Sequence, residues 1–277
     1  MKKLINLFVV VLVLCLCLVL GGCGKKDDNT IVVGTMVTPG EPILKFIEEK
    51  YEAKGYKLEW ETYNSFEFVN PALSEGTVDV NLFQHEPYLN NYNAANNEDL
   101  KVAAKLYDCV YGGYTKKNIN SLDEMPEGAK IAVAQDASNL SRCLYILDDA
   151  GVIELREGIE GLATIEDIAN DNGYEIVTMS TNFIASALDD SDVYLGVVNA
   201  TFAIAAGLTS DQLLCQEADP EHVNANILAC RAEDINEQWL IDLVEVLTSD
   251  ETAEFIRNEF KGTIIPYFVS YVGKEEK

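Results

Sequence analysis

Short apolar or alternating runs are spaced along most of the chain, and amphipathic stretches lie between them. The runs predict strands at 31–35, 57–62, 78–83, 130–134, 175–179, 193–198 and 226–230. The amphipathic stretches predict helices at 70–75, 85–95, 138–150, 164–170, 182–188, 199–206, 234–247 and 251–260. Strands that alternate with helices at this spacing predict an α/β fold with mostly parallel sheets.

The first residues of the chain have the pattern of an export signal. Two lysines precede an almost wholly apolar run over 4–20, which has the length of a signal peptide and is short for a transmembrane helix. The run ends in Leu-Gly-Gly-Cys, which resembles a bacterial lipobox, in which the cysteine is acylated, for example with palmitate, and the preceding segment is removed. The pattern predicts a signal peptide over 1–22, a lipidated tether over 23–30 and attachment to the extracytoplasmic face of the cell membrane through Cys23. A plain N-terminal membrane anchor is the alternative.

Composition and charge exclude several classes of protein. Hydrophobic residues make up 48% of the 277, which is enough for a buried core and excludes a wholly disordered chain. The chain has 46 acidic and 20 basic residues and a formal charge of −26, which loss of the two N-terminal lysines would take to −28. This charge disfavours nucleic acid, which needs a basic face, and electrostatic binding to an anionic membrane. With only two histidines and no cluster at ligand spacing, the sequence predicts no metal site.

The cysteines leave the redox state open. After removal of a signal peptide and lipidation of Cys23, the cysteines that remain are Cys109, Cys143, Cys215 and Cys230. An even number outside the cytoplasm permits disulfides, but the spacing is wide and no Cys-x-x-Cys is present. Because Cys143 and Cys230 lie in apolar stretches, we expect them to be buried thiols.

Several separated segments carry a specific resemblance. Residues 70–89 read NPALSEGTVDVNLFQHEPYL, and the shorter segments SNLSR, LDD, VNAT and VNANI follow at 138–142, 188–190, 198–201 and 223–227. In this order they resemble the methionine-binding lipoprotein family of the NlpA type, over about 31–268. Members of that family are the solute-binding components of ABC importers of D- and L-methionine.

The resemblance implies a bilobal periplasmic-binding-protein-like fold, with two α/β lobes and a ligand cleft between them. Residues 31–112 plus 224–277 would form the first lobe, and residues 113–223 the second. The implied function is amino-acid transport. The protein would capture L- or D-methionine outside the cell and deliver it to an ABC permease and its ATPase, with no catalysis and no cofactor.

An aromatic slot is expected around the Phe-Gln-His-Glu-Pro-Tyr segment. Phe83, His85 and Tyr88 lie around a predicted strand-to-helix junction, where binding sites of α/β proteins collect. Rings there would pack against a thioether, which is soft and apolar, whereas ordinary core packing of Phe83 and Tyr88 is the alternative. Phe66 stands where the family often has a tyrosine, so the resemblance adds it to the slot. His85 fits a slot wall or a hydrogen-bonding role better than a metal ligand or a general base.

A carboxylate clamp is expected at Arg142. This arginine lies in the first turn of the predicted 138–150 helix, away from its apolar face. Helix N-termini attract anions, and a guanidinium binds a carboxylate through two hydrogen bonds. A surface arginine paired to an acid is the alternative. The resemblance implies that Arg142 holds the ligand carboxylate and that Asn199 and Asn226 bind its amino and carboxylate groups. It also adds Asn139 to the ligand-binding set.

Other functions stay open from the residues alone. An exported hydrolase is one alternative, but neither a Gly-x-Ser-x-Gly nor a His-Glu-x-x-His motif is present. An adhesin or a purely structural lipoprotein is another. Within the class of binding proteins, the ligand would be another amino acid or a methionine-containing dipeptide.

Overall fold

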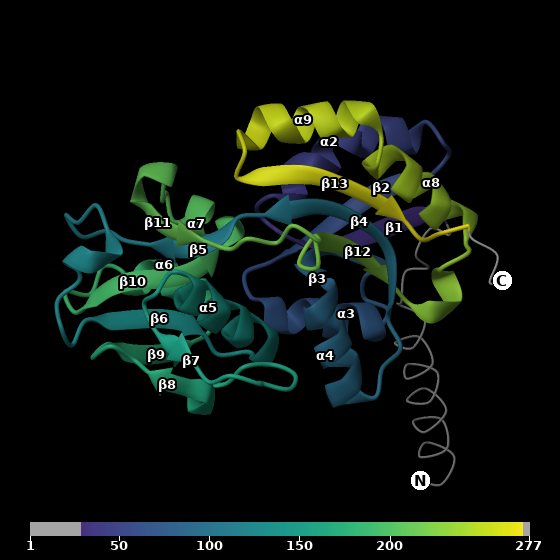
Figure 1. The fold of residues 1–277 in the computed structure, drawn as a ribbon. Helices are drawn as coiled ribbons and strands as arrows, with labels where there is room; N and C mark the ends of the chain where they lie inside the picture. Colours follow the sequence, from purple (N-terminus) through teal and green to yellow (C-terminus); the bar gives the residue numbers. More distant parts are fainter. Residues whose placement is uncertain (1–28, 274–277) are drawn as a thin grey trace, which may run out of the picture. The chain divides into compact units, whose positions relative to one another are not determined.

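The computed structural model describes residues 29–273, and the chain from Ile31 onward forms one compact unit. Cys23, the predicted signal peptide and most of the predicted tether lie outside the described residues. Within the described part, the strands gather in two larger sheets and one short hairpin (Figure 1). We call each larger sheet with its helices a lobe.

The first lobe is built on a six-stranded sheet with helices on both faces. Its strands, in spatial order, are β13 (Ile264–Ser270), β4 (Lys101–Cys109), β12 (Asn226–Cys230), β3 (Val80–His85), β1 (Thr30–Met36) and β2 (Lys57–Tyr63). Its helices are α2 (Gly40–Glu52), α8 (Gln238–Leu247) and α9 (Asp250–Phe260) on one face, and α3 (Val69–Ser74) and α4 (Glu86–Asn96) on the other. In Figure 1 the yellow elements α9 and β13 lie beside the purple α2, so segments far apart in the sequence share this lobe.

Strand β12 shows how burial on both faces of the sheet determines its residues. Leu228 and Cys230 belong to the apolar cluster under α2, α8 and α9, whereas Ile227 and Ala229 belong to the cluster under α3 and α4. All four side chains are fully buried, because successive side chains of a strand point to opposite faces of the sheet. A strand covered on both faces is continuously apolar, so the run over 226–230 predicts this strand correctly.

The second lobe is built on a five-stranded sheet. Its strands, in spatial order, are β11 (Leu213–Gln216), β5 (Tyr111–Tyr114), β10 (Val193–Asn199), β6 (Lys130–Ala134) and β9 (Glu175–Met179). It carries α5 (Ala137–Asp149), α6 (Thr181–Ala187), α7 (Ala200–Ala205) and the hairpin of β7 (Glu154–Leu155) and β8 (Ile168–Asn170). Short 3₁₀ helices lie at Phe66–Phe68, Leu122–Glu124, Ile165–Asp167, Ser210–Gln212 and Ala232–Asp234. On α5, Cys143, Leu144 and Leu147 are buried at the predicted helical spacing.

Two connections join the lobes. The first is Val110 alone, between β4 and β5. Its backbone is held on both sides: Val110 N donates to Thr263 O at 3.1 Å, and Ala200 N donates to Val110 O at 2.7 Å. The second connection is the segment 217–225, between β11 and β12.

Side chains tie the second connection to the first lobe. His222 Nδ1 lies 2.6 Å from Asp108 Oδ2, and the His222 ring stacks on Tyr267 with centroids 3.9 Å apart. The Asp219 carboxylate accepts hydrogen bonds of 3.0 and 2.7 Å from backbone N–H groups of the same segment. The connection is therefore a folded turn packed against β4 and β13.

The expectation of mostly parallel sheets is wrong. β1 pairs with β3 and β6 pairs with β9 and β10 in parallel, but β12 runs antiparallel to β3 and β4, and β5 runs antiparallel to β10 and β11. The connections between the lobes explain this. β4 leads into one connection and β12 leads out of the other. Both connections lie at the same end of the sheet, so the two strands run in opposite directions.

The predicted helix over 164–170 is also wrong. Thr164 and Asp167 form a capping box around a single 3₁₀ turn, with Thr164 N donating to Asp167 Oδ2 at 2.8 Å. The chain then extends as β8, which pairs with β7. The capping box thus limits the segment to one turn. The pattern of apolar residues does not indicate this capping.

Two further properties bear on the sequence expectations. No helix between residues 29 and 273 is long and apolar enough to cross a membrane. The four cysteines of this part are free thiols, and Cys143 and Cys230 are buried as expected. Burial raises the pKa of Cys143 to about 11 and that of Cys230 to about 12.

Candidate functional site

A narrow cavity of about 10 Å³, roughly the room of one water, lies between the two lobes. Its lining consists of Phe66, Phe83, Gln84, His85, Tyr88, Cys109, Asn139, Arg142, Asn199 and Asn226. All eight residues singled out above for ligand binding are in this lining. Gln84 and Cys109 are the two lining residues that the sequence did not single out.

A chain of hydrogen bonds joins the lobes at one wall of the cavity. His85 is the N-cap of α4, and its Nδ1 accepts a hydrogen bond of 3.1 Å from Tyr88 N. Nε2 therefore carries the ring proton and donates at 3.1 Å to Asn139 Oδ1 on α5 of the second lobe. The amide nitrogen of Asn139 in turn donates to the two Asp136 carboxylate oxygens at 3.0 and 3.1 Å. Burial and the charge of Arg142 lower the pKa of His85 to about 3, so the ring is neutral.

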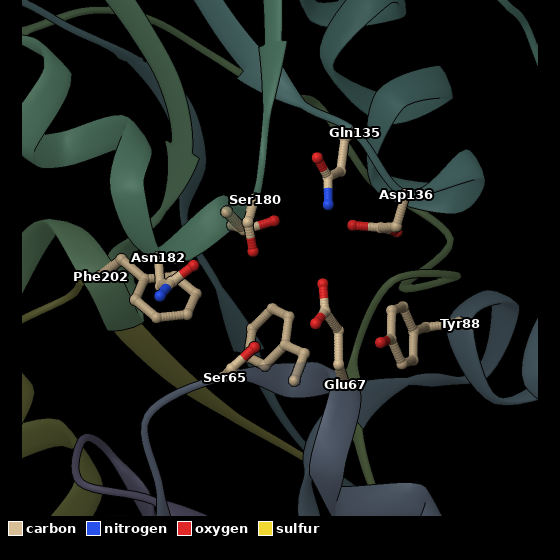
Figure 2. A pocket seen from close by; sticks show the side chains of 10 residues that line it. Ser65, Glu67, Tyr88, Gln135, Asp136, Ser180, Asn182 and Phe202 are labelled. Carbon is tan, nitrogen blue, oxygen red and sulfur yellow. The ribbon is translucent and has the colours of Figure 1, made fainter.

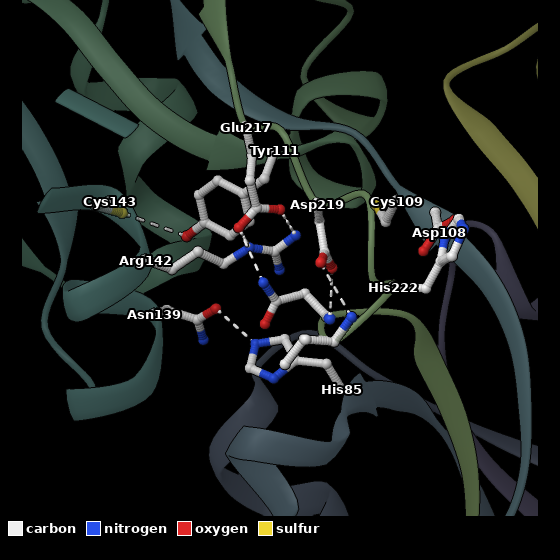
Figure 3. A network of polar contacts seen from close by, with 12 residues as sticks. His85, Asp108, Cys109, Tyr111, Asn139, Arg142, Cys143, Glu217, Asp219 and His222 are labelled. Carbon is white, nitrogen blue, oxygen red and sulfur yellow. Dashed lines mark hydrogen bonds and ion pairs between the residues drawn. The ribbon is translucent and has the colours of Figure 1, made fainter. Parts of the chain in front are cut away.

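Arg142 is buried and is paired with an acid from the second connection. Its Nε donates to Glu217 Oε1 at 2.6 Å and its Nη2 to Glu217 Oε2 at 2.5 Å (Figure 3). The guanidinium carbon also lies 4.4 Å from the ring centroid of Tyr111, a cation–π contact. Burial alone would lower the pKa of Arg142, but the hydrogen bonds and charge of Glu217 outweigh it and raise the pKa. The pair uses two of the roughly five N–H donors of a guanidinium, so others remain for a ligand.

Aromatic rings form the apolar part of the lining. The Phe66 ring centroid lies 5.5 Å from that of Phe83, 6.0 Å from Tyr88 and 5.0 Å from Phe202. The first three rings belong to the first lobe and Phe202 lies on α7 of the second, so these contacts also cross between the lobes. The rings meet tilted or edge-on, an arrangement that presents both faces and edges to an apolar group.

Two asparagines bring unused polar groups to the cavity. Asn199 is the N-cap of α7, and its Oδ1 accepts a long hydrogen bond of 3.4 Å from Phe202 N. Asn226 begins β12 and lies opposite His85 in the sheet. The two residues are only 9% and 8% exposed. Neither side-chain nitrogen donates a hydrogen bond to another residue in the described range 29–273. Both amides line the cavity, where their oxygens and nitrogens can bind a polar ligand.

Gln84 belongs to a buried cluster of amides behind the aromatic rings. Its Nε2 donates to Asn70 Oδ1 at 2.6 Å and to Asn81 Oδ1 at 3.0 Å, and Asn70 Nδ2 donates back to Gln84 Oε1 at 2.8 Å. The three side chains are at most 3% exposed. The cluster ties β3 to α3 and so fixes the end of the strand from which Phe83 and His85 project.

A second, polar pocket of about 20 Å³ borders the cavity. It shares Phe66 and Tyr88 with the cavity lining. Figure 2 shows Glu67 of the first lobe pointing toward Gln135 and Asp136 of the second across this pocket. A ligand that leaves the cavity past Phe66 and Tyr88 therefore meets polar groups from both lobes.

The lining combines one charged pair with neutral groups. Burial raises the pKa of the Cys109 thiol, so this sulfur stays protonated and adds a soft, uncharged surface. Among residues 29–273, no group of three or more His, Cys, Asp or Glu side chains is placed to hold a metal ion. The groups that remain are one guanidinium with its carboxylate, a neutral imidazole, amides and rings.

Glu217 and Asp136 are the site residues that the sequence did not reveal. Glu217 pairs with Arg142 across 75 positions of sequence. The chain has 46 acidic residues, and no motif marks this one as the partner. Asp136 stands just before a predicted helix, so its role as N-cap of α5 was within reach of a capping argument.

A match to a protein-family model identifies the family of this chain. The NlpA lipoprotein model matches residues 31–268. The chain belongs to the NlpA lipoprotein family. This NlpA lipoprotein is 34% identical over 254 residues to the D-methionine-binding lipoprotein MetQ of Salmonella typhi, covering 88% of this chain and 92% of the relative. It is 30% identical over 274 residues to the methionine-binding lipoprotein MetQ of Bacillus subtilis (strain 168), covering 96% and 99%.

Solved structures extend the likeness to three dimensions. A nutrient binding protein from Burkholderia cenocepacia, bound to methionine, superposes on this NlpA lipoprotein with a TM-score of 0.81. The two are 33% identical, and the match covers 86% of this chain and all of that one, 100%. The resemblance read from the sequence and the bilobal periplasmic-binding-protein-like α/β fold are thus confirmed.

Proposed function

We propose that this NlpA lipoprotein captures methionine outside the cell and delivers it to an ABC importer. The observation that carries the proposal is that a guanidinium, unused amides and aromatic rings line one small cavity. These are the partners that the carboxylate, ammonium and thioether of methionine require. The names of the MetQ relatives and the methionine-bound structural neighbour support this ligand.

The polar end of the ligand belongs with the charged and amide groups. Its carboxylate binds the N–H groups of Arg142 that Glu217 leaves unused. Its ammonium donates to the amide oxygens of Asn199 and Asn226, and their amide nitrogens donate to the carboxylate.

The apolar end of the ligand lies among the rings of Phe66, Phe83 and Tyr88. Sulfur–aromatic contacts contribute about 0.3–1.5 kcal/mol there, beyond the burial of the side chain itself. His85 and Asn139 form the wall beside it and hold the two lobes together through their hydrogen bond.

Movement of the lobes gives the cycle of capture and release. We assign residues 31–109 plus 226–273 to one lobe and 111–216 to the other, and so begin the second lobe with β5, about two residues earlier than the 31–112 and 113–223 expected from the sequence. The contacts that cross the cavity, His85 with Asn139 and Phe66 with Phe202, belong to the closed form. Ligand stabilises this form by burial between the lobes, and contact with the permease favours the open one.

The anchor and the partners complete the proposal. Cys23 carries the lipid, residues 23–30 tether the folded part to the extracytoplasmic face of the cell membrane, and the importer consists of a permease and its ATPase. The lipoprotein family supports the anchor, and the lipobox-like Leu-Gly-Gly-Cys marks the residue.

A calorimetric screen tests the function. The protein without residues 1–23 is unfolded and refolded to remove carried-over ligand, and is then titrated with the common amino acids, D-methionine and Gly-Met. Methionine should bind most tightly. Tighter binding of another amino acid or of Gly-Met would reassign the ligand, and a ligand converted during the titration would indicate an enzyme, such as an exported hydrolase.

A further inference from the structure

Glu217 forms a buried ion pair with Arg142 next to the cavity. Its carboxylate accepts hydrogen bonds from Arg142 Nε and Nη2, and a further one of 2.9 Å from Asn224 Nδ2. The side chains of Arg142 and Glu217 are 6% and 15% exposed. Removal of either partner would therefore leave the other as a poorly solvated charge.

The other titratable groups of the cavity lining are uncharged. Burial lowers the pKa of His85 to about 3 and raises the pKa of Tyr88 and Cys109 above their usual values. The remaining lining residues are amides and phenylalanines. The Arg142 cation and the Glu217 anion therefore cancel, and the site has no net charge.

Three more carboxylates lie nearby: Glu67 faces the bordering polar pocket, and Asp136 and Asp219 are held by other groups. Asp136 accepts hydrogen bonds from the backbone and side chain of Asn139 at the N-terminus of α5, where the helix dipole favours a negative charge. Asp219 accepts from two backbone N–H groups of the second connection. Neither aspartate lines the cavity, whereas Glu217 is bonded directly to the one cation that does.

We propose that Glu217 sets the net charge of the ligand, so that the cavity takes zwitterions in preference to anions of the same shape. This inference rests on the proposed function. A ligand carboxylate on Arg142 shares one guanidinium with Glu217. In a zwitterion, the ligand ammonium compensates this second carboxylate. An anion without the ammonium would leave two negative charges on one cation in a site of low dielectric, where their repulsion is strong.

The test compares two ligands of the same length that differ only in the α-substituent, an ammonium or a hydroxyl. Methionine is a zwitterion, whereas 2-hydroxy-4-(methylsulfanyl)butanoate has a hydroxyl in place of the ammonium and is an anion. Calorimetry gives the ratio of their dissociation constants for each protein. Wild type should bind methionine about tenfold or more tightly than the hydroxy analogue. In Glu217→Gln the site gains a net positive charge. The preference for methionine over the hydroxy analogue, measured as the ratio of their dissociation constants, should fall by about tenfold or more.

Matched variants separate charge from structure. Glu217→Asp keeps the carboxylate, and Asn224→Ala removes a hydrogen bond to Glu217 but no charge. Both should keep the wild-type ratio within about threefold, because the net charge of the site is unchanged. A purely structural role for Glu217 predicts that Glu217→Gln weakens both ligands together and leaves the ratio as it was.

The outcomes distinguish this inference from the proposed function. An unchanged ratio in Glu217→Gln, with methionine still bound by wild type, overturns the inference alone. A wild type that binds neither ligand overturns both. Should Glu217→Gln fail to fold, Glu217→Ala is the substitute. It also removes the negative charge, leaves room for water beside the guanidinium and should shift the ratio of dissociation constants in the same direction. The wild-type ratio needs no variant, and equal affinity for the two ligands overturns the inference.

Discussion

His85 on α4 and Asn139 on α5 are joined by a hydrogen bond of 3.1 Å that crosses from one lobe to the other. The Nδ1 of the same ring accepts from the backbone of Tyr88, so a neutral ring with its proton on Nε2 makes both bonds. A second proton would place a positive charge in a buried site beside Arg142. The cap that Nδ1 gives to α4 therefore depends on an uncharged His85, whereas the bond to Asn139 needs only the proton on Nε2.

The neutral state of His85 predicts a pH dependence of stability. Its pKa is about 3 in the folded protein and about 6.5 in an unfolded chain. Below about pH 6.5 the unfolded state binds a proton that the folded state does not, so stability is present above that pH and is lost as pH falls toward 3. This one group should contribute a slope of about 1.4 kcal/mol per pH unit. His85→Asn should remove it.

Urea unfolding between about pH 7 and pH 4 measures this slope for both proteins. The carboxylates of the chain titrate in both, so the difference between the two curves isolates His85. The two free energies of unfolding should converge as pH falls. Parallel curves would show that His85 binds a proton as readily in the folded protein as in the unfolded chain.

Arg142→Ala should weaken methionine binding severely. If this residue holds the ligand carboxylate, its loss leaves a buried carboxylate unpaired, which costs about 2–5 kcal/mol. Affinity should fall by about 30-fold to several thousand-fold, and Arg142→Lys, which keeps the charge but loses the planar fork, should be intermediate. Methionine methyl ester has no carboxylate and should be penalised much less by Arg142→Ala. Titration calorimetry measures all three effects.

The control for this prediction is Arg156→Ala, because Arg156 is exposed. It should leave affinity nearly unchanged. Arg142→Ala should also lower the melting temperature, since it leaves Glu217 without its bidentate partner. Affinity of Arg142→Ala within about threefold of wild type would show that the cavity binds its ligand in another way.

The aromatic rings should select a thioether over a plain hydrocarbon chain. Methionine should bind more tightly than norleucine, by about 0.3–1.5 kcal/mol for the sulfur–aromatic contact. Tyr88→Ala and Phe83→Ala should weaken methionine binding, whereas Tyr145→Ala, on a ring that is 41% exposed, should not. Glutamate should be rejected, because its side-chain carboxylate would be desolvated among the rings. Equal affinity for methionine and glutamate contradicts this placement.

The lipid anchor is tested at Cys23, outside the described residues. Cys23→Ser removes the thiol that would be acylated, so labelling with a palmitate analogue should be lost and the precursor should keep its signal peptide. Deletion of residues 1–23 should give a folded protein in the soluble fraction with full ligand affinity. Labelling of Cys23→Ser at the wild-type level contradicts the lipobox assignment.

The elements predicted well from the sequence are those whose residues carry their own signal. β9 and β12 lie within the predicted bounds because their runs are apolar and short. β11 and β13 were missed because β11 is only four residues long and Pro266 interrupts the apolar run of β13.

The site residues likewise divide into those that a local sequence signal marks and those that it does not. Arg142 was found because a helix N-terminus and a family motif coincide there, and the motif around His85 located the aromatic rings. The pairing of Arg142 with Glu217 depends on how the second connection folds back over the cavity. Nothing local to Glu217 encodes that path, so only the three-dimensional structure reveals it.

The backbone hydrogen bonds of Val110 determine how the lobes can move relative to each other. Its N–H is bonded to one lobe and its C=O to the other, so Val110 is the hinge residue of the first connection. Cys109 and Asn226 adjoin the two connections, and Asn199 precedes Ala200, whose N–H is bonded to Val110. A rotation of the lobes about Val110 would move the groups beside it least, so the groups proposed for the amino end of a ligand would keep their places relative to one another while the lobes close.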